Sequence, residues 1–195
     1  FILILHRIRI FFRLKKPDSS IILVLVISVK ETPMIALKFP NQKQFTQALF
    51  LQPMFDAYTL YEGSVVTGCT YEIDGHRNAE YYMSDEEETS QGAYLRWEEI
   101  RPSCFQMIKG KRLPLQFKFV LRAPETLVEQ LLASTETGIT ADQVQALHLI
   151  VQYRSGELTV TTGTALSFFT LDKTLEQLWD RYVGQFFEKQ QFETV

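Results

Sequence analysis

The stretch that decides the fold is WEEIRPSCFQMIKGKRLPLQFKFVL, from Trp97 to Leu121. Its first half repeats apolar residues at helical spacing, which predicts a helix with one buried face. Its second half alternates apolar and polar residues after Pro114, which predicts a strand with one buried face. The apolar positions are Trp97, Ile100, Cys104, Phe105 and Ile108 in the helix, and Leu115, Phe117, Phe119 and Leu121 in the strand.

Two residues set the expected limits of this helix. Pro102 lacks an N–H and crowds the preceding turn, so we expect either a kink near Ile100 or a first regular turn that begins at Pro102. Gly110 follows the last apolar residue and has a lysine on each side. This arrangement predicts a left-handed C-cap at Gly110, with cations at the negative end of the helix dipole.

The rest of the chain follows the same two periodicities. The residues after Asp172 carry the longest apolar stripe, which predicts a C-terminal amphipathic helix that packs on a sheet. We expect hairpin turns at Gly63-Ser64, Asp74-Gly75 and Ser155-Gly156. The fold class is therefore α+β, with antiparallel sheet or sheets and about four helices.

The order strand, helix, hairpin occurs twice. It runs from Met34 to Ile73 and again from Leu115 to Leu171. This repetition leaves open a duplicated β-α-β-β unit, similar in topology to the halves of sliding-clamp domains. Topology alone carries no function.

Composition indicates one soluble domain. The chain has 195 residues, of which 46% are hydrophobic and 22% charged, enough for one sizeable core. Its two cysteines, Cys69 and Cys104, share no metal-ligand spacing with each other or with the histidines. We expect reduced thiols and a cytoplasmic location, with no metal site and no cofactor.

The first 33 residues differ from the rest. They are rich in Ile, Leu, Val and Phe, and they carry six basic and two acidic residues. Their apolar runs are too short to span a membrane. We interpret residues 1–33 as an upstream-translated or non-native leader and residues 34–195 as a single α+β domain. A real membrane-surface or targeting segment is the alternative, and without it we expect no membrane contact.

The charge of the remaining domain bears on its partners. Without the leader, the domain contains 14 Lys and Arg and 21 Asp and Glu, which gives a net charge of −7. The field of such a domain repels phosphate, so general nucleic-acid binding is not expected. A local basic patch could still bind an anionic ligand or a protein partner.

The candidate for such a patch is the segment IKGKR, from Ile108 to Arg112. Backbone N–H groups around a glycine turn, with basic side chains beside them, can hold a phosphate or a carboxylate. The alternative is simple complementarity to the helix dipole. The predicted anion-binding residues are Lys109, Gly110, Lys111 and Arg112, together with Arg101.

A second candidate is a polar pocket. Its predicted residues are Thr161, Thr162, Thr164 and His148, because hydroxyls around Gly163 could line a pocket wall. Threonine is also a common strand residue and Gly163 could mark a bulge, which is the plainer interpretation. His76 and His148 could act as a base or as ligands, yet nothing in the sequence pairs them. No catalytic residue is assigned.

Three segments together resemble a known family. They are YLRWEEIRPSCFQMIKGKRLPLQFKF (Tyr94–Phe119), YRSGELTVTTGTALSFFTLDKTLEQLWD (Tyr153–Asp180) and the Asp-Gly pair after TYEI. They are similar to an uncharacterised bacterial family of small proteins of unknown function. The resemblance covers Met34 to the C-terminal helix and implies a boundary, but no activity.

These observations favour a non-enzymatic binding or interaction module with a local anion-facing patch. One alternative is an enzyme that acts on a small anionic substrate, with His76 or His148 as the base. Another alternative is a clamp-like assembly subunit.

Overall fold

The structure is a computed structural model that describes residues 8–11, 26–29, 35–78, 80–81 and 92–195. The chain divides into two compact units, residues 1–32 and 33–195. In the first unit, β1 (Ile8–Phe11) and β2 (Val26–Val29) form an antiparallel pair. Most of the predicted leader lies outside the described residues, so its status stays a prediction.

The second unit contains six strands and four α-helices among its described residues. In chain order they are β3 (Ala36–Lys38), α1 (Gln42–Leu51), β4 (Thr59–Val66), β5 (Thr70–Asp74), α2 (Trp97–Ile108), β6 (Gln116–Arg122), α3 (Glu125–Ala133), β7 (Val144–Arg154), β8 (Glu157–Leu166) and α4 (Thr174–Lys189). Short 3-10 helices, Pro53–Phe55 and Ala141–Gln143, precede β4 and β7. The predicted α+β class is confirmed.

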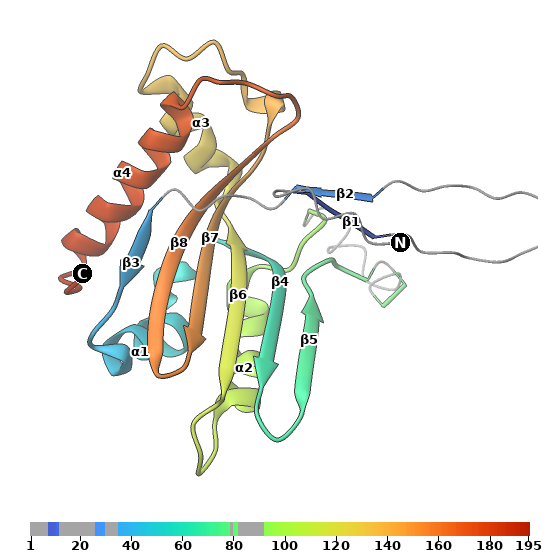
Figure 1. Cartoon of the computed structure of the whole chain (residues 1–195), viewed down its shortest axis with the longest axis vertical. Coiled ribbons are helices and arrows are strands. Elements are labelled where there is room, and N and C mark those ends of the chain that lie inside the picture. The colour runs from blue at the N-terminus through green and yellow to red at the C-terminus, as the bar shows by residue number, and fades with distance from the viewer. Residues whose placement is uncertain (1–7, 12–25, 30–34, 79, 82–91) are drawn as a thin grey trace, which may run out of the picture. The chain divides into compact units, whose positions relative to one another are not determined.

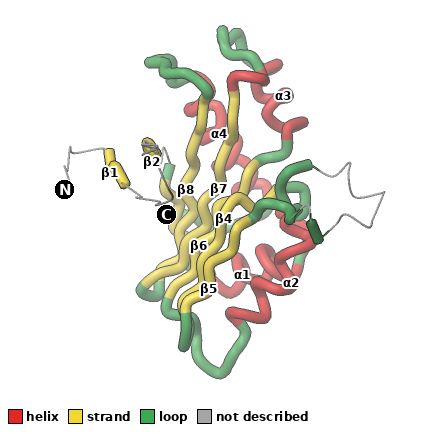
Figure 2. The backbone as a smooth tube through the Cα atoms, turned by 90° about the vertical axis from the view of Figure 1, so that its right-hand side faces the viewer, coloured by secondary structure: helices red, strands yellow, loops and turns green. Residues whose placement is uncertain are grey.

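The six strands form one antiparallel sheet in the order β3-β8-β7-β6-β4-β5 (Figure 1). The helices lie on one side of this sheet (Figure 2). Alternate residues of the central strands point to the helices, so the core lies between the two layers. Phe119, Leu149 and Val160 are examples of its fully buried residues.

The C-terminal helix α4 packs on β8, as the sequence predicts. Leu175, Trp179, Val183 and Phe187 recur every four residues and are all buried, which is one face of a helix. The helix begins after Asp172, whose carboxylate accepts a hydrogen bond from the Thr174 N–H at 2.9 Å. That bond satisfies one of the free donors of the first turn.

The helix α2 ends just before Gly110, as the sequence predicts, but it does not begin at Pro102 and has no left-handed cap. The alternative of a kink near Ile100 stays a prediction. The helix begins at Trp97 and continues through Pro102, because the carboxylate of Glu99 caps its start by accepting the Arg96 N–H. It ends at Ile108, where Lys109 turns to an extended conformation, with φ −66° and ψ 117°. Gly110 does not adopt a positive φ, so no left-handed cap forms.

One of the three expected hairpin turns is found where it was predicted. Ser155 and Gly156 have φ of 54° and 78°, and they join β7 to β8. The pair Gly63-Ser64 instead lies inside β4, which turns into β5 at residues 67–69. Gly75 makes no turn but passes so close to β4 that a Cβ there would lie 1.8 Å from the Leu60 carbonyl oxygen.

The β-α-β-β element order occurs twice, as β3-α1-β4-β5 and as β6-α3-β7-β8. The two groups pair differently. Strand β6 lies beside β7 of its own group, whereas β3 pairs with β8 at the far edge of the sheet.

Candidate functional site

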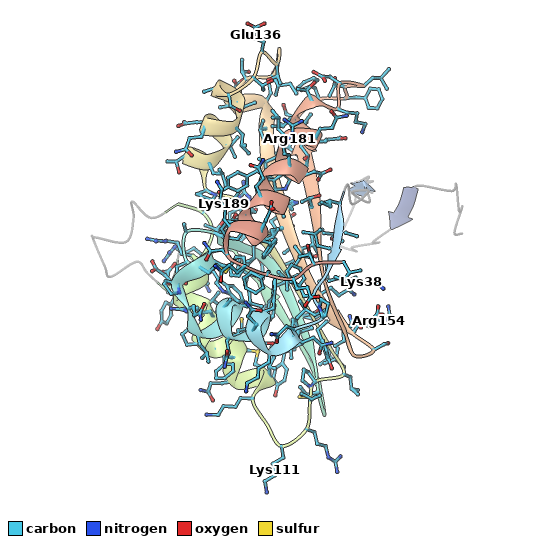
Figure 3. All side chains as sticks on the ribbon, turned by 90° about the vertical axis from the view of Figure 1, so that its left-hand side faces the viewer. Lys38, Lys111, Glu136, Arg154, Arg181 and Lys189 are labelled. Carbon is cyan, nitrogen blue, oxygen red and sulfur yellow. The ribbon has the colours of Figure 1, made fainter. Side chains whose placement is uncertain are left out.

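The loop between α2 and β6, residues 109–115, forms one end of the second unit. We call it the basic loop. Pro114 is buried and the Leu115 N–H donates to the Val66 carbonyl oxygen at 2.8 Å, so the loop is anchored beside the β4–β5 hairpin. Lys111 lies at its tip, beyond the helices and strands (Figure 3).

Three cations of the basic loop are available to a ligand. Lys109, Lys111 and Arg112 are exposed, and among the described residues their side chains make no hydrogen bond or ion pair. Other lysines of the same sheet are engaged, since Lys118 lies 2.8 Å from a carboxylate oxygen of Glu62. The loop therefore carries positive charge that no described carboxylate neutralises.

The same loop exposes two leucines. Leu113 is 80% exposed and Leu115 is 69% exposed. The sequence predicted Leu115 as a buried strand residue, which is wrong because β6 begins one residue later, at Gln116. Exposed leucines beside free cations make this loop amphipathic.

An apolar groove of about 440 Å³ adjoins the basic loop. It lies between α1 and the end of α2, over the ends of β6, β7 and β8. Its lining residues are Gln42, Lys43, Thr46, Gln47 and Leu51 of α1, Phe105 and Ile108 of α2, Leu113 and Pro114 of the loop, and Phe117, Tyr153 and Leu158 of the sheet. A volume of this size falls in the range of small-molecule sites.

Arg101, the fifth residue of the predicted anion site, does not join the loop. Its guanidinium donates to the Gln52 carbonyl oxygen at 2.7 Å and lies 3.2 Å from a carboxylate oxygen of Asp56. These contacts tie α2 to the segment that follows α1. Arg101 therefore has a positioning role in this structure, and the free cations are those of residues 109–112.

The structure divides the predicted polar pocket between two faces of the sheet. Thr162 and Thr164 pair with inward-facing Leu149 and Leu147, so they point to the helices. Thr161 and His148 lie on the opposite face. The four residues therefore do not line one cavity.

Thr162 links three elements. Its hydroxyl donates to Asp180 of α4 and accepts the Ile35 N–H at 3.1 Å, just before β3. Burial raises the pKa of the Asp180 carboxyl above its usual value, the hydrogen bond from Thr162 opposes that rise, and the Glu176 carboxylate adds to it. This threonine has a structural role in the fold.

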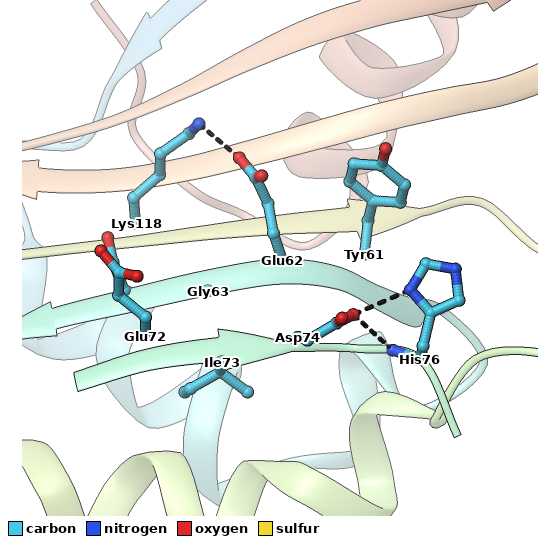
Figure 4. A pocket seen from close by; sticks show the side chains of 9 residues that line it. Tyr61, Glu62, Gly63, Glu72, Ile73, Asp74, His76 and Lys118 are labelled. Carbon is cyan, nitrogen blue, oxygen red and sulfur yellow. Dashed lines mark hydrogen bonds and ion pairs between the residues drawn. The ribbon is translucent and has the colours of Figure 1, made fainter. Parts of the chain in front are cut away.

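A second pocket, of about 630 Å³, lies on the open face of the sheet (Figure 4). It contains two polar pairs. Lys118 binds Glu62, and both the backbone N–H and the ring Nδ1 of His76 lie within 2.9 Å of one Asp74 oxygen. Those two hydrogen bonds lower the pKa of Asp74.

The two histidines lie on this same open face and flank a pair of tyrosines. The ring of His76 lies 4.2 Å from that of Tyr94, Tyr94 lies 5.7 Å from Tyr61, and Tyr61 lies 5.3 Å from His148. The guanidinium of Arg122 covers Tyr94 at 4.5 Å. The adjoining pocket is lined by three carboxylates, Glu62, Glu72 and Asp74, and by one lysine, Lys118. The electrostatic field of the pocket therefore disfavours an anionic substrate.

Neither the groove nor the second pocket could be predicted from the sequence. Both depend on residues far apart in the chain, such as Thr46 with Tyr153, or Glu62 with Lys118. The one sequence feature that indicated part of the groove is the pattern of apolar residues at the end of α2. No sequence feature indicated the second pocket, because strand register decides which polar side chains lie next to each other.

The described part of the chain lacks two particular kinds of feature. Within it, no group of three or more His, Cys, Asp or Glu side chains could hold a metal ion. None of its helices combines the length and the apolar character needed to cross a bilayer.

The fold is an antiparallel sheet with its helices on one side, and one end of the domain carries the basic loop and the apolar groove. Residues 48–194 match the family model described as "Family of unknown function (DUF5721)", and the chain belongs to that family. The predicted resemblance to a family of unknown function is confirmed. Neither the curated proteins nor the solved structures give a match.

Proposed function

We propose that this protein is a non-enzymatic binding module whose binding surface is the basic loop together with the apolar groove. The observation that carries the proposal is the position of three free cations, Lys109, Lys111 and Arg112, next to exposed apolar surface. The proposed partner is amphiphilic, with an anionic group and an apolar part. The free thiols Cys69 and Cys104 support a cytoplasmic location.

The charge of the loop supports an anionic partner. Lysine and arginine without carboxylate neighbours attract anions, and arginine can bind a carboxylate or a phosphate with two parallel hydrogen bonds. The chain as a whole is acidic, with a formal net charge of −3. Attraction of an anion therefore depends on this local patch, and the rest of the surface opposes it.

The groove supports an apolar component in the partner. Its floor includes Phe105, Phe117 and Leu158, and Leu51 at its wall is 58% exposed. Covering apolar area stabilises a complex by roughly 25 cal/mol per Å² before the cost of association. An anion without an apolar part would leave this surface in water.

Fluorescence titration with 8-anilinonaphthalene-1-sulfonate tests the proposal, because this probe is a small amphiphilic anion. We expect the native full chain to bind it with enhanced emission, and we expect Lys111→Glu with Arg112→Glu to weaken binding at least about tenfold. The matched control is Arg181→Glu with Lys189→Glu on α4, an equal change of charge at exposed positions. That variant is expected to bind as the unaltered chain does.

Two results would contradict the proposal. One is absence of probe binding by the natively folded chain. The other is equal weakening by both double variants, which would reflect net charge instead of a site. Near-ultraviolet circular dichroism of each variant checks that its tertiary packing is native, since loosely packed states also bind this probe.

The enzyme alternative depends on the open-face pocket. Asp74 and His76 form a pair there that could orient a base. The surrounding carboxylates favour a neutral or cationic molecule over the anionic substrate that the sequence suggested. Enzymatic activity at this pocket is therefore less well supported than binding at the basic loop. A clamp-like assembly is the other alternative, and sedimentation as a monomer would count against it.

A further inference from the structure

We infer that the partner of the basic loop is the surface of an anionic phospholipid bilayer, which the protein contacts peripherally. This inference rests on the proposed function and names the partner of the same site. The loop would place Lys109, Lys111 and Arg112 among lipid head groups and Leu113 and Leu115 at the acyl boundary. Peripheral contact needs no spanning helix, so it agrees with the finding on the described helices. It departs from the expectation that residues 34–195 make no membrane contact.

The shape of the loop favours a broad surface. Lys111 lies at the tip of one end of the second unit (Figure 3). The two exposed leucines belong to the same loop by sequence. Leu115 does not line the groove, so a single small amphiphile bound in the groove would leave Leu115 in water. A bilayer surface covers both leucines together, and it presents an anion to each cation.

The charge distribution favours one orientation. Glu136, in the segment after α3, lies at the opposite end of the unit from Lys111 (Figure 3). Helix α3 adds the exposed carboxylates of Glu125 and Glu129 near that end. An anionic surface therefore attracts the basic end and repels the α3 end, which orients the domain before contact.

A second exposed apolar segment shows why the cations matter. Phe169 and Leu171, in the segment between β8 and α4, are 87% and 82% exposed. They are thus as exposed as the leucines of the basic loop, but the residues beside them are Phe168, Thr170 and Asp172, and the nearest cation, Lys173, is paired with Glu176 at 2.8 Å. Apolar exposure without a free cation gives little preference for anionic lipid, so this segment provides an internal control.

Co-sedimentation with large vesicles tests the inference in the full chain. The vesicles are phosphatidylcholine alone, or a three-to-one mixture of phosphatidylcholine and phosphatidylglycerol. We expect binding to the anionic vesicles only, weakened when the ionic strength is raised. Lys111→Glu with Arg112→Glu is expected to lower the partition coefficient at least about thirtyfold.

Three further variants separate this loop from other parts of the chain. Leu113→Ser with Leu115→Ser is expected to reduce binding at least about tenfold, because the apolar part is lost. Phe169→Ser with Leu171→Ser removes equally exposed apolar groups, and Arg181→Glu with Lys189→Glu changes charge equally. Both controls are expected to bind as the unaltered chain does.

Several outcomes would overturn the inference. They are equal binding to both kinds of vesicle, no binding to either, or full binding by the Lys111→Glu, Arg112→Glu variant. That last result would assign any binding to another part of the chain, such as residues 1–33. If the fluorescent anion binds at the loop but vesicles do not, the proposed function stands and the bilayer inference fails.

Discussion

The indole N–H of Trp179 donates to the backbone carbonyl oxygen of His148 at 3.0 Å, which fixes α4 to the central strand β7. Trp97 makes the same kind of bond to Leu49, at 2.7 Å, and joins α2 to α1. Both indoles are fully buried. Two buried tryptophans thus join α4 to the sheet and α2 to α1, each by a large apolar surface and one directed bond.

Replacement of Trp179 by Phe tests this bond. The change leaves the His148 carbonyl oxygen without this donor in a buried site and removes part of a packed ring, so we expect a loss of about 2 to 4 kcal/mol in the free energy of unfolding. Urea unfolding followed by circular dichroism measures it. Trp97→Phe is the matched change in another helix and should cost a similar amount. A loss below about 0.5 kcal/mol in both variants would show that the bonds are unimportant.

The close passage of Gly75 beside β4 gives a second prediction. A methyl group at Gly75 would overlap the Leu60 carbonyl oxygen, which belongs to the backbone and has little room to move. We expect Gly75→Ala to destabilise the domain by about 3 kcal/mol or more. Gly68→Ala is the control, because nothing lies within 4 Å of a Cβ there, and its effect should be small. Equal melting temperatures for the two variants would contradict the geometry.

Asp180 predicts a pH dependence. Its pKa is higher in the folded chain than in the unfolded chain, so the folded state holds the proton more tightly. Between the unfolded and the folded pKa of Asp180, the contribution of this carboxyl to the free energy of unfolding therefore rises as pH falls and decreases as pH rises. Asp180→Asn keeps an acceptor for Thr162 and removes the charge. We expect this variant to be slightly more stable than the unaltered chain at pH 7, with the difference lost at about pH 3, below the ordinary carboxyl pKa of 3.8. Denaturant midpoints at both pH values would refute this if the variant were less stable at pH 7.

The two cysteines are expected to differ in reactivity. Cys69 is exposed on the turn between β4 and β5, whereas Cys104 is buried, and burial raises its pKa to about 12. A thiol reacts through its thiolate, so Cys104 should stay unmodified until the chain unfolds. Titration with Ellman's reagent should release one equivalent from the native chain and a second after denaturation. Immediate reaction of both thiols would show that the core around α2 is more open than in this structure.

Local patterns predicted the parts of the fold in which one face is simply buried. The stripe of α4 and the alternation of β7 are examples, because periodicity reports burial directly. The patterns failed where a glycine has a packing role. Gly75 follows an aspartate, as in a tight turn, yet it is required for the close approach to Leu60. Only the tertiary structure distinguishes these two uses of glycine.

The candidate site was predictable only in part. The cations of residues 109–112 are adjacent in sequence, so a charge pattern identifies them. The groove beside them is not local, since its walls come from α1, α2 and three strands. The exposure of Leu115 was also hidden, because alternation continues through it although the strand begins one residue later. The site therefore required the packing of distant segments.

The central property proposed for this protein is that the basic loop and the groove form its binding surface. The most direct test is a heteronuclear NMR titration of the isotopically labelled full chain with the fluorescent sulfonate used above. We predict that the amide shifts which change most belong to residues 42–51 and 105–117, around the groove and the loop. Changes centred on the open-face pocket, at residues 61–64 and 72–76, would contradict the account.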